Sequence, residues 1–124
     1  MSFQFKTTFK EPGSYVIACD GRLDTETSPQ LEKEVKWLLQ KAPQLLALDL
    51  KGVNYMSSAG VRILIMAQKG VKPHGGKLAL LNIQPPVKKV LEIINALPNQ
   101  KIFKDMEELD RYLDAIQRKV REGD

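Results

Sequence analysis

The segment Leu45–Leu50 constrains the fold of this chain more than any other part of the sequence. Its residues, LLALDL, are apolar apart from Asp49, so a strand formed from them would bury side chains on both of its faces. Such a strand lies inside a sheet, with helices covering at least one face. The segment therefore predicts a central strand of an α/β domain.

Strands and helices alternate on either side of this segment. Pro29 and Pro85 mark helix starts, where the fixed φ of proline suits the first turn, and Pro43 ends the first helix. The expected elements are strands over 3–9 and 15–19, a helix from 27–29 to before 43, a strand over 45–50, a helix over 58–70, a strand over 77–81, a helix from 85, a strand at 102–103 and a helix from 105. This order, β-β-α-β-α-β-α-β-α, predicts one mixed sheet with crossover helices, in a single domain spanning residues 1–124.

Composition narrows the classes of function. The 19 basic and 15 acidic residues are mixed along the chain, with no basic run or aromatic–basic alternation, so we expect no nucleic-acid binding. No segment approaches the ~18 consecutive apolar residues of a membrane span, and the polar start lacks a signal-peptide core. We therefore expect a cytoplasmic protein with no membrane insertion. The single cysteine, Cys19, agrees with a reducing compartment.

Residues typical of an active site are missing from the sequence. His74, the only histidine, lies between Pro73 and Gly75 and is interpreted as an exposed loop residue. No cysteine or carboxylate cluster surrounds it in sequence to bind a metal, and without a second histidine a Ser–His–Asp arrangement is not expected. Cys19 lies in an apolar run and is predicted to be a small core residue, while Gly75-Gly76 lacks the context of a phosphate-binding loop. These absences favour a protein that binds a partner, without catalytic, metal or cofactor site.

A serine pair, Ser57-Ser58, opens the helix that follows the central strand and a predicted loop. Either hydroxyl can cap the helix, a structural role worth ~1 kcal/mol, and small Ala59 and Gly60 allow close approach of another surface. Residues 61–67 are apolar almost all round the helix apart from one arginine. The helix therefore either lies deep in the core or offers an apolar strip to a partner.

Three motifs carry a resemblance to a known family: Gly21-Arg22-Leu23-Asp24, Leu48-Asp49-Leu50 and, at residues 55–64, YMSSAGVRIL. Together with the opening hairpin, they resemble the STAS domain of bacterial anti-sigma factor antagonists over essentially the whole chain. The resemblance implies that Ser58 is phosphorylated by the anti-sigma factor, itself a serine kinase, and dephosphorylated by a serine phosphatase. The unmodified protein would bind the anti-sigma factor and free the sigma factor, a partner only indirectly.

The resemblance also implies a partner-binding surface. Asp24 matches a family aspartate that contacts the kinase from a loop beside the phosphorylated helix, and Asn54 and Tyr55 match the loop before the serine. The implied surface comprises Asp24, Asn54, Tyr55, Met56, Ser57, Ser58, Ala59, Gly60, Val61 and Arg62.

The chain departs from the family pattern at two positions. Many members have Asp where this chain has Ser57, and Ser where it has Ala59, so Ser57 is a rival site of phosphorylation. Arg62, one turn further on, is either a contact for the phosphate or a solvated arginine. Asp49 is interpreted as a strand-end residue that bonds nearby backbone amides.

Two other functions stay open. A STAS-type subunit could dock onto a membrane transport ATPase through the same helix, without phosphorylation. A nucleotide-binding module is disfavoured by the missing phosphate-binding loop.

Overall fold

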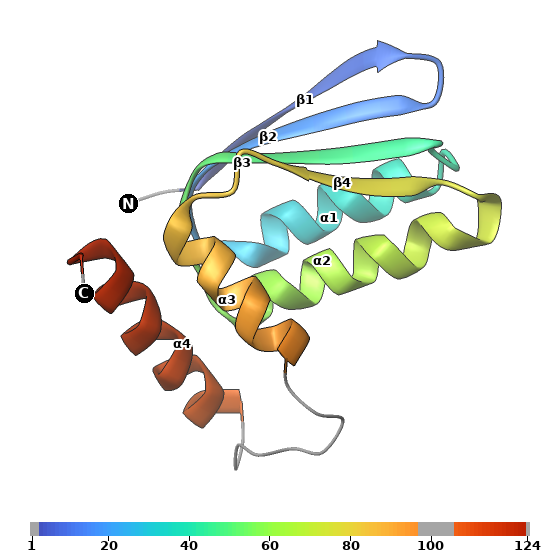
Figure 1. Ribbon diagram of the computed structural model, residues 1–124. Helices are drawn as coiled ribbons and strands as arrows, with labels where there is room; N and C mark the ends of the chain where they lie inside the picture. Colours follow the sequence, from blue (N-terminus) through green and yellow to red (C-terminus); the bar gives the residue numbers. More distant parts are fainter. Residues whose placement is uncertain (1–2, 97–105, 124) are drawn as a thin grey trace.

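A four-stranded sheet with the order β1-β2-β3-β4 organises the chain (Figure 1). The computed structural model describes residues 3–96 and 106–123. The elements are β1 (Gln4–Glu11), β2 (Ser14–Leu23), α1 (Ser28–Leu39), β3 (Leu45–Met56), α2 (Ser58–Val71), the short 3-10 helix η1 (Lys72–His74), β4 (Lys77–Leu81), α3 (Pro85–Ala96) and α4 (Met106–Arg121). The predicted strand at 102–103 and the predicted helix start at Asp105 lie outside the described residues.

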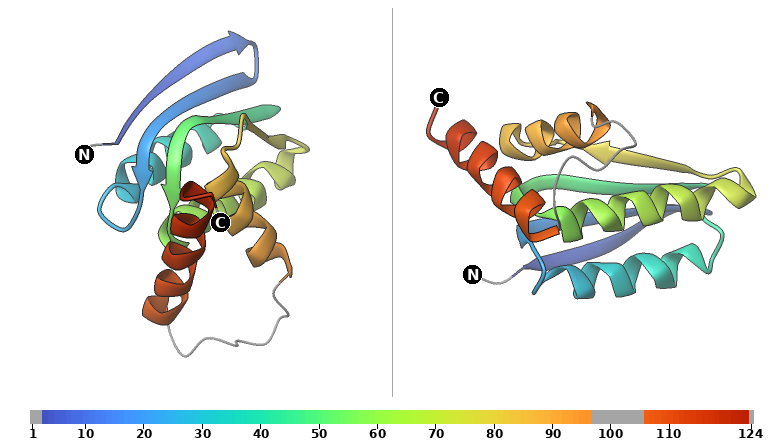
Figure 2. Two further views of the ribbon diagram at one scale, coloured as in Figure 1. Left: turned by 60° about the vertical axis from the view of Figure 1, so that its left-hand side comes forward. Right: turned by 90° about the horizontal axis from the view of Figure 1, so that it is seen from below.

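The sheet is mixed, as the order of elements predicts. Strands β1 and β2 form an antiparallel hairpin, and its turn contains Gly13 at φ +84°, a conformation that glycine adopts without strain. The pairs β2–β3 and β3–β4 are parallel, so α1 and α2 are the crossover connections between them. The two helices lie side by side on one face of the sheet and begin at the same end of it (Figures 1 and 2).

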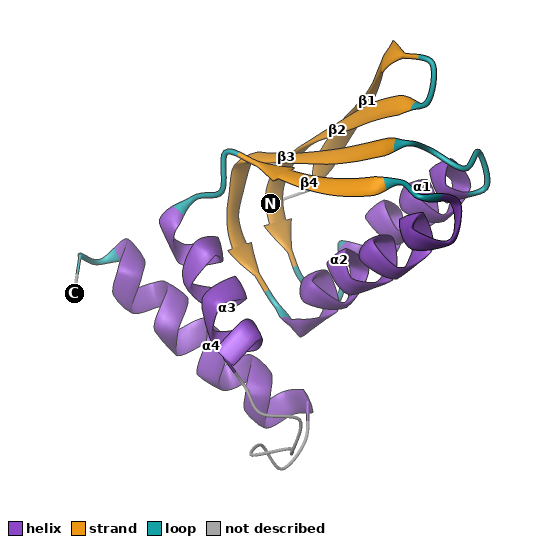
Figure 3. Cartoon of the chain, turned by 45° about the vertical axis from the view of Figure 1, so that its right-hand side comes forward, coloured by secondary structure: helices purple, strands orange, loops and turns teal. Residues whose placement is uncertain are grey.

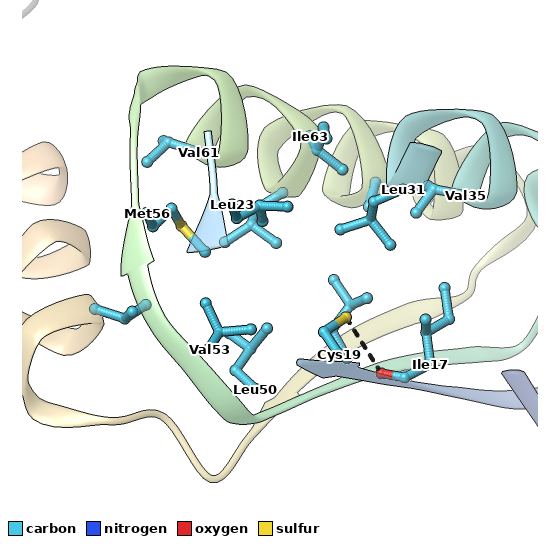
Figure 4. Close-up of a cluster of buried hydrophobic side chains, with 14 of the residues drawn as sticks. Ile17, Cys19, Leu23, Leu31, Val35, Leu50, Val53, Met56, Val61 and Ile63 are labelled. Carbon is cyan, nitrogen blue, oxygen red and sulfur yellow. Dashed lines mark hydrogen bonds between the residues drawn. The ribbon is translucent and has the colours of Figure 1, made fainter. Parts of the chain in front are cut away.

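The core lies between this helix pair and the sheet. Helix α1 buries Leu31, Val35 and Leu38, which share one face because their spacing follows the helical period. Figure 4 shows Leu31 and Val35, together with Val61 and Ile63 of α2, pointing at side chains of β2 and β3. The largest fully buried side chains include Ile17, Leu23, Leu46, Leu48, Leu50, Val53 and Met56. Leu45–Leu50 is the core of a central strand, as expected.

Strand β3 is longer than the sequence suggested. Residues 51–56 were expected in a loop, but the strand continues to Met56 and bends past the end of β4 toward the start of α2 (Figure 3). The continuation depends on β2, whose register with β3 shifts around Asp20 and Gly21. Gly52 permits this close approach, since a Cβ there would lie 2.6 Å from Oδ1 of Asp20 and 2.9 Å from the carbonyl oxygen of Cys19.

The overhanging end of β3 lacks a strand partner on its β4 side within the described part of the chain. Pairing with β4 ends at Asp49 and Leu81. Helices α3 and α4 pack on each other beyond that point and both contact β3. The side chain of Gln84, just before α3, donates to the carbonyl of Lys51. The overhang is thus held by helices and side chains instead of a strand.

The lone histidine has a structural contact. His74 is half-buried in η1, and its Nε2 lies 2.8 Å from the carbonyl oxygen of Pro43. The interpretation as an exposed loop residue is therefore wrong, because the loop packs back on the end of the α1–β3 connection.

Candidate functional site

Ser57 and Ser58 lie where β3 ends and α2 begins, and Ser57 is the helix cap. Its backbone is extended (φ −93°, ψ 179°), and its Oγ accepts a hydrogen bond from the amide of Ala59 at 3.2 Å. Its own amide donates to the carbonyl of Leu23 at 2.9 Å, and the residue is 4% exposed. The hydroxyl of Ser57 therefore stabilises the start of α2.

Ser58 is the first residue of α2 and lines a cavity of about 450 Å³ between α1 and α2. It is 6% exposed. Because the two helices begin at the same end of the sheet, the partly positive starts of both lie near this cavity. The cavity is lined by Thr25, Ser28, Pro29, Glu32, Ser58, Ala59, Arg62, Ile63 and Met66.

Asp24 follows β2 directly, beside the serine pair, since β2 and β3 are parallel neighbours here. Its Oδ1 accepts hydrogen bonds from the amides of Glu26 at 3.0 Å and Thr27 at 3.1 Å. Its Oδ2 lies 3.7 Å from Nε of Arg22, and both side chains are partly exposed. Asp24 therefore orders the loop before α1 while its carboxylate stays accessible to a partner.

Asn54 and Tyr55 lie in the last part of β3, so their predicted placement in a loop is wrong. Asn54 is exposed, whereas Tyr55 is buried. The guanidinium of Arg22, the partner of Tyr55 in the β2–β3 register, lies 3.8 Å from the centre of the tyrosine ring. The strand places this pair immediately before the serines.

The residues predicted to bind a partner fall into two groups in the structure. Asp24, Asn54, Ala59 and Arg62 are exposed or half-buried and form the accessible surface around the start of α2. The remaining ones are buried: Tyr55, Met56, Ser57, Ser58, Gly60 and Val61. The buried residues pack in the interior next to the accessible ones.

Gly60 brings the first turn of α2 directly onto the core. A Cβ at this position would lie 2.7 Å from Cγ of Met56 and 3.0 Å from Cδ2 of Leu23. Figure 4 shows Met56, Leu23 and Val61 gathered beneath this turn. The position of Ser58 is therefore set by close packing of the helix start on fully buried side chains.

A side chain of α4 holds the last residue of β3. Gln117, fully buried, donates from Nε2 to the carbonyl of Met56 at 2.9 Å and accepts at Oε1 from the amide of Met56 at 2.7 Å. Sequence reasoning missed Gln117. The available signal was its place four and eight residues after Leu113 and Leu109, as a polar residue in an apolar stripe of a helix.

A second, open groove of about 750 Å³ continues from the cavity along α1 and α2. Ile65, 45% exposed, and half-buried Leu39 and Met66 form its apolar part. It is lined by Lys36, Leu39, Gln40, Arg62, Ile65, Met66, Lys69 and Gly70. One face of α2 lies in the core, and another presents an apolar strip with cations beside it.

Cys19 and Asp49 lie away from this surface. Burial, with a smaller effect from the charge of Asp49, raises the pKa of the Cys19 thiol to about 12, and the thiol donates to the carbonyl of Ile17 at 3.7 Å. Cys19 is a core residue, as predicted. Asp49 accepts hydrogen bonds from the side chain of Asn82 and the amide of Lys51, and these lower the pKa of its carboxyl.

Residues 3–96 and 106–123 contain neither a cluster of metal-binding side chains nor a membrane-spanning helix. No cluster of three or more His, Cys, Asp or Glu side chains in these ranges could hold a metal ion. No helix in them is both long and apolar enough to cross a bilayer.

Comparisons with known proteins agree on one family. The family model of the STAS domain matches residues 6–109. BtrV of Bordetella bronchiseptica is 33% identical over 89 residues, which are 71% of this chain and 77% of BtrV. The anti-sigma F factor antagonist of Paenibacillus polymyxa is 25% identical over 105 residues, 84% of this chain and 85% of that protein.

The fold is also similar to solved structures of the anti-sigma factor antagonist SpoIIAA. The unphosphorylated form aligns with a TM-score of 0.63 at 22% identity, over 88% of this chain and 97% of that one. The phosphorylated form, from Bacillus, aligns with a TM-score of 0.64 at 22% identity, over 88% and 99%.

Proposed function

Because the chain belongs to the STAS domain family, we propose that it is an anti-sigma factor antagonist controlled by phosphorylation of Ser58. The unmodified chain binds an anti-sigma factor that is also a serine kinase, and so releases a sigma factor. Phosphorylation ends this binding, and a serine phosphatase restores it. The chain acts by binding and is itself the substrate of both enzymes.

Relatives support the role and its control by phosphate. The Paenibacillus polymyxa relative is an anti-sigma F factor antagonist, and it covers most of this chain. SpoIIAA exists in a phosphorylated and an unphosphorylated form, and this chain matches both about equally well. A fold of this shape therefore accommodates a phosphate without a change of architecture.

The contrast between Ser57 and Ser58 carries the assignment of the site. The Oγ of Ser57 is engaged as the cap of α2, so modifying it would remove a hydrogen bond that stabilises the helix. Ser58 lines the cavity beside accessible Ala59 and Arg62. Modification at Ser58 adds charge next to the partner surface and leaves the cap in place.

Electrostatics explains how the phosphate would end binding. A phosphoserine carries about −1.5 to −2 charges at neutral pH. A partner packed over the start of α2 would have to take this added charge out of water, and burying a charged group is costly. A loss of ~3–4 kcal/mol in binding corresponds to a roughly 100- to 1,000-fold weaker complex.

The surface around Ser58 also suggests what the partner presents. The accessible group of Asp24, Asn54, Ala59 and Arg62 continues into the second groove, whose apolar part lies beside Lys36, Lys69 and Arg62. An apolar segment with acidic flanks fits this combination. We expect the anti-sigma factor to dock such a segment there.

Phosphorylation by the cognate anti-sigma factor with ATP tests the proposal. We expect one phosphoserine, mapped by mass spectrometry to Ser58, which Ser58→Ala removes and Ser57→Ala retains. Ser58→Asp should fold normally and bind the anti-sigma factor at least about 100-fold more weakly by calorimetry. Ser14→Ala, a buried serine at the start of β2, is the matched control.

Two results would contradict it. An unchanged level of modification in Ser58→Ala would show that the site is elsewhere. Stable co-purification with a membrane transport ATPase, with no dependence on a kinase, would favour the transporter-subunit function instead.

A further inference from the structure

Ser28 has a buried hydroxyl without a hydrogen-bond partner. The residue is 4% exposed, and among the described residues its Oγ is the buried side-chain polar atom for which no partner is found. Buried hydroxyls normally have a partner, because leaving one unpaired costs free energy. The hydroxyl of Ser28 is therefore a donor that no residue in the described part of the chain accepts.

The surroundings of Ser28 indicate an anion. Ser28 is the first residue of α1 and Ser58 the first residue of α2, and both line the same cavity. The start of α1 has no side-chain cap, since the hydroxyl of Thr27 bonds to the backbone of Asp24 and Arg22 instead. The partial positive charge at these two adjacent helix starts favours negative charge between them.

The charged side chains on the cavity wall also favour an anion. Arg62 lies one turn after Ser58 on α2, is exposed, and makes no ion pair with any residue in the described part of the chain. Glu32 also lines the cavity, but its Oε2 lies 2.9 Å from Nζ of Lys36, which offsets its charge. Arg62 is thus the cation available to an anion in the cavity.

We propose that this cavity receives the phosphate carried by Ser58, with the hydroxyl of Ser28 and the guanidinium of Arg62 as its donors. The inference rests on the proposed phosphorylation of Ser58. Transfer of the γ-phosphoryl group of ATP forms an O–P bond at Oγ of Ser58, breaks the bond to ADP and releases the hydroxyl proton. Ser58 is 6% exposed and lies on the cavity wall, so the phosphate on its Oγ would lie in the cavity.

If the cavity binds the phosphate, replacing Ser28 should affect stability differently in the unmodified and the phosphorylated chain. In the unmodified chain its hydroxyl is unpaired, so Ser28→Ala should leave the midpoint of urea unfolding unchanged or raise it. In the phosphorylated chain the hydroxyl donates to a charged acceptor, so the same substitution should lower the midpoint. A merely structural serine would have the same effect in both states.

The test uses the full chain with phosphoserine installed at position 58 by codon-directed incorporation, so no kinase is needed. Phosphorus NMR titration should show the pKa of the phosphate below the usual value of about 6 in the parent protein. Ser28→Ala and Arg62→Gln should each raise that pKa by roughly half a unit or more. Both should also speed dephosphorylation by a non-specific phosphatase several-fold.

Matched controls use the same substitutions outside the cavity. Ser14→Ala and Lys69→Gln should leave the phosphate pKa and the dephosphorylation rate at the parent values. The phosphate pKa could be equal in the phosphoserine protein and in its Ser28→Ala and Arg62→Gln variants. That result would overturn the proposed phosphate site in the cavity, and would leave the proposed function intact. Undiminished binding of the anti-sigma factor to the phosphoserine protein would instead refute the proposed function.

Discussion

The side chain of Gln117 makes two hydrogen bonds with the backbone of Met56. In a wider sheet, a neighbouring strand would make these bonds. The side-chain amide of Gln117 reaches both the N–H and the C=O of the last residue of β3, at 2.7 and 2.9 Å. The contact joins α4 to the residue directly before Ser57, the cap of α2. The start of α2 is therefore stabilised by a residue far away in sequence.

Replacing Gln117 by leucine should destabilise the protein. The amide and carbonyl of Met56 would lose their partners in a buried setting, which costs about 1–3 kcal/mol for each group. We expect a loss of roughly 2–4 kcal/mol in urea unfolding and faster hydrogen exchange at the Met56 amide. Arg118→Ala, at the exposed neighbour, should change stability little. Equal stability of Gln117→Leu and the parent would contradict this role.

Gly60 and Gly70 of α2 should respond to alanine in opposite directions. Gly60→Ala would place a methyl group against fully buried Met56 and Leu23, and we expect a loss of about 1–3 kcal/mol. At Gly70 the nearest atoms belong to the end of the half-buried Leu39 side chain, which can move. Gly70→Ala should therefore be neutral or stabilise by up to about 1 kcal/mol. Thermal unfolding of both variants checks this, and equal effects would disprove the packing argument.

The capping role of Ser57 can be measured in the unmodified chain. Ser57→Ala removes the acceptor for the amide of Ala59 and should cost about 1 kcal/mol. Ser57→Asp supplies another acceptor of similar quality and should keep most of the stability. Urea unfolding of the unsubstituted protein, Ser57→Ala and Ser57→Asp measures these differences. An alanine variant as stable as the unsubstituted protein would show that the cap is unimportant.

The carboxyl of Asp49 should titrate below its usual range. The hydrogen bond from Asn82 is the largest cause, followed by the one from the amide of Lys51. Since the folded pKa is lowered, the ionised carboxylate stabilises the fold above the unfolded pKa, and this contribution is lost as the pH falls through the folded value. NMR titration should show a higher pKa for Asp49 in Asn82→Ala. The same pKa in both proteins would exclude Asn82 as the cause.

Cys19 should be unreactive in the folded protein. Its pKa is raised to about 12, mainly by burial, so almost no thiolate is present at pH 8. Iodoacetamide should label it slowly under native conditions and quickly in urea, with mass spectrometry as the readout. Rapid native labelling would show that the strand opens around it.

The parts of the fold that the sequence predicted depend on local spacing. The buried face of α1, with Leu31, Val35 and Leu38, follows from the helical period alone. The length of β3 could not be predicted in this way, because residues 51–56 have a mixed pattern and pair with β2 only after a shift of register. Strand pairing between distant segments decided the structure there.

The candidate site divides in the same manner. The serine pair could be located from capping preferences, but which serine caps the helix depends on the extended backbone of Ser57. Ser28 looks in sequence like an ordinary residue at a helix start. Its unpaired hydroxyl, and its place on the same cavity as Ser58, follow from the parallel packing of α1 and α2.

The bond between Gln117 and Met56 also has a consequence for the order of synthesis. Met56 leaves the ribosome 61 residues ahead of Gln117, and closing a loop of this length is a late, entropically costly event in folding. The strands, crossover helices and Ser58 can therefore assemble while the end of β3 still lacks this partner. In a nascent chain at that stage the start of α2 should be loosely held, and it should become fully ordered only after α4 has docked.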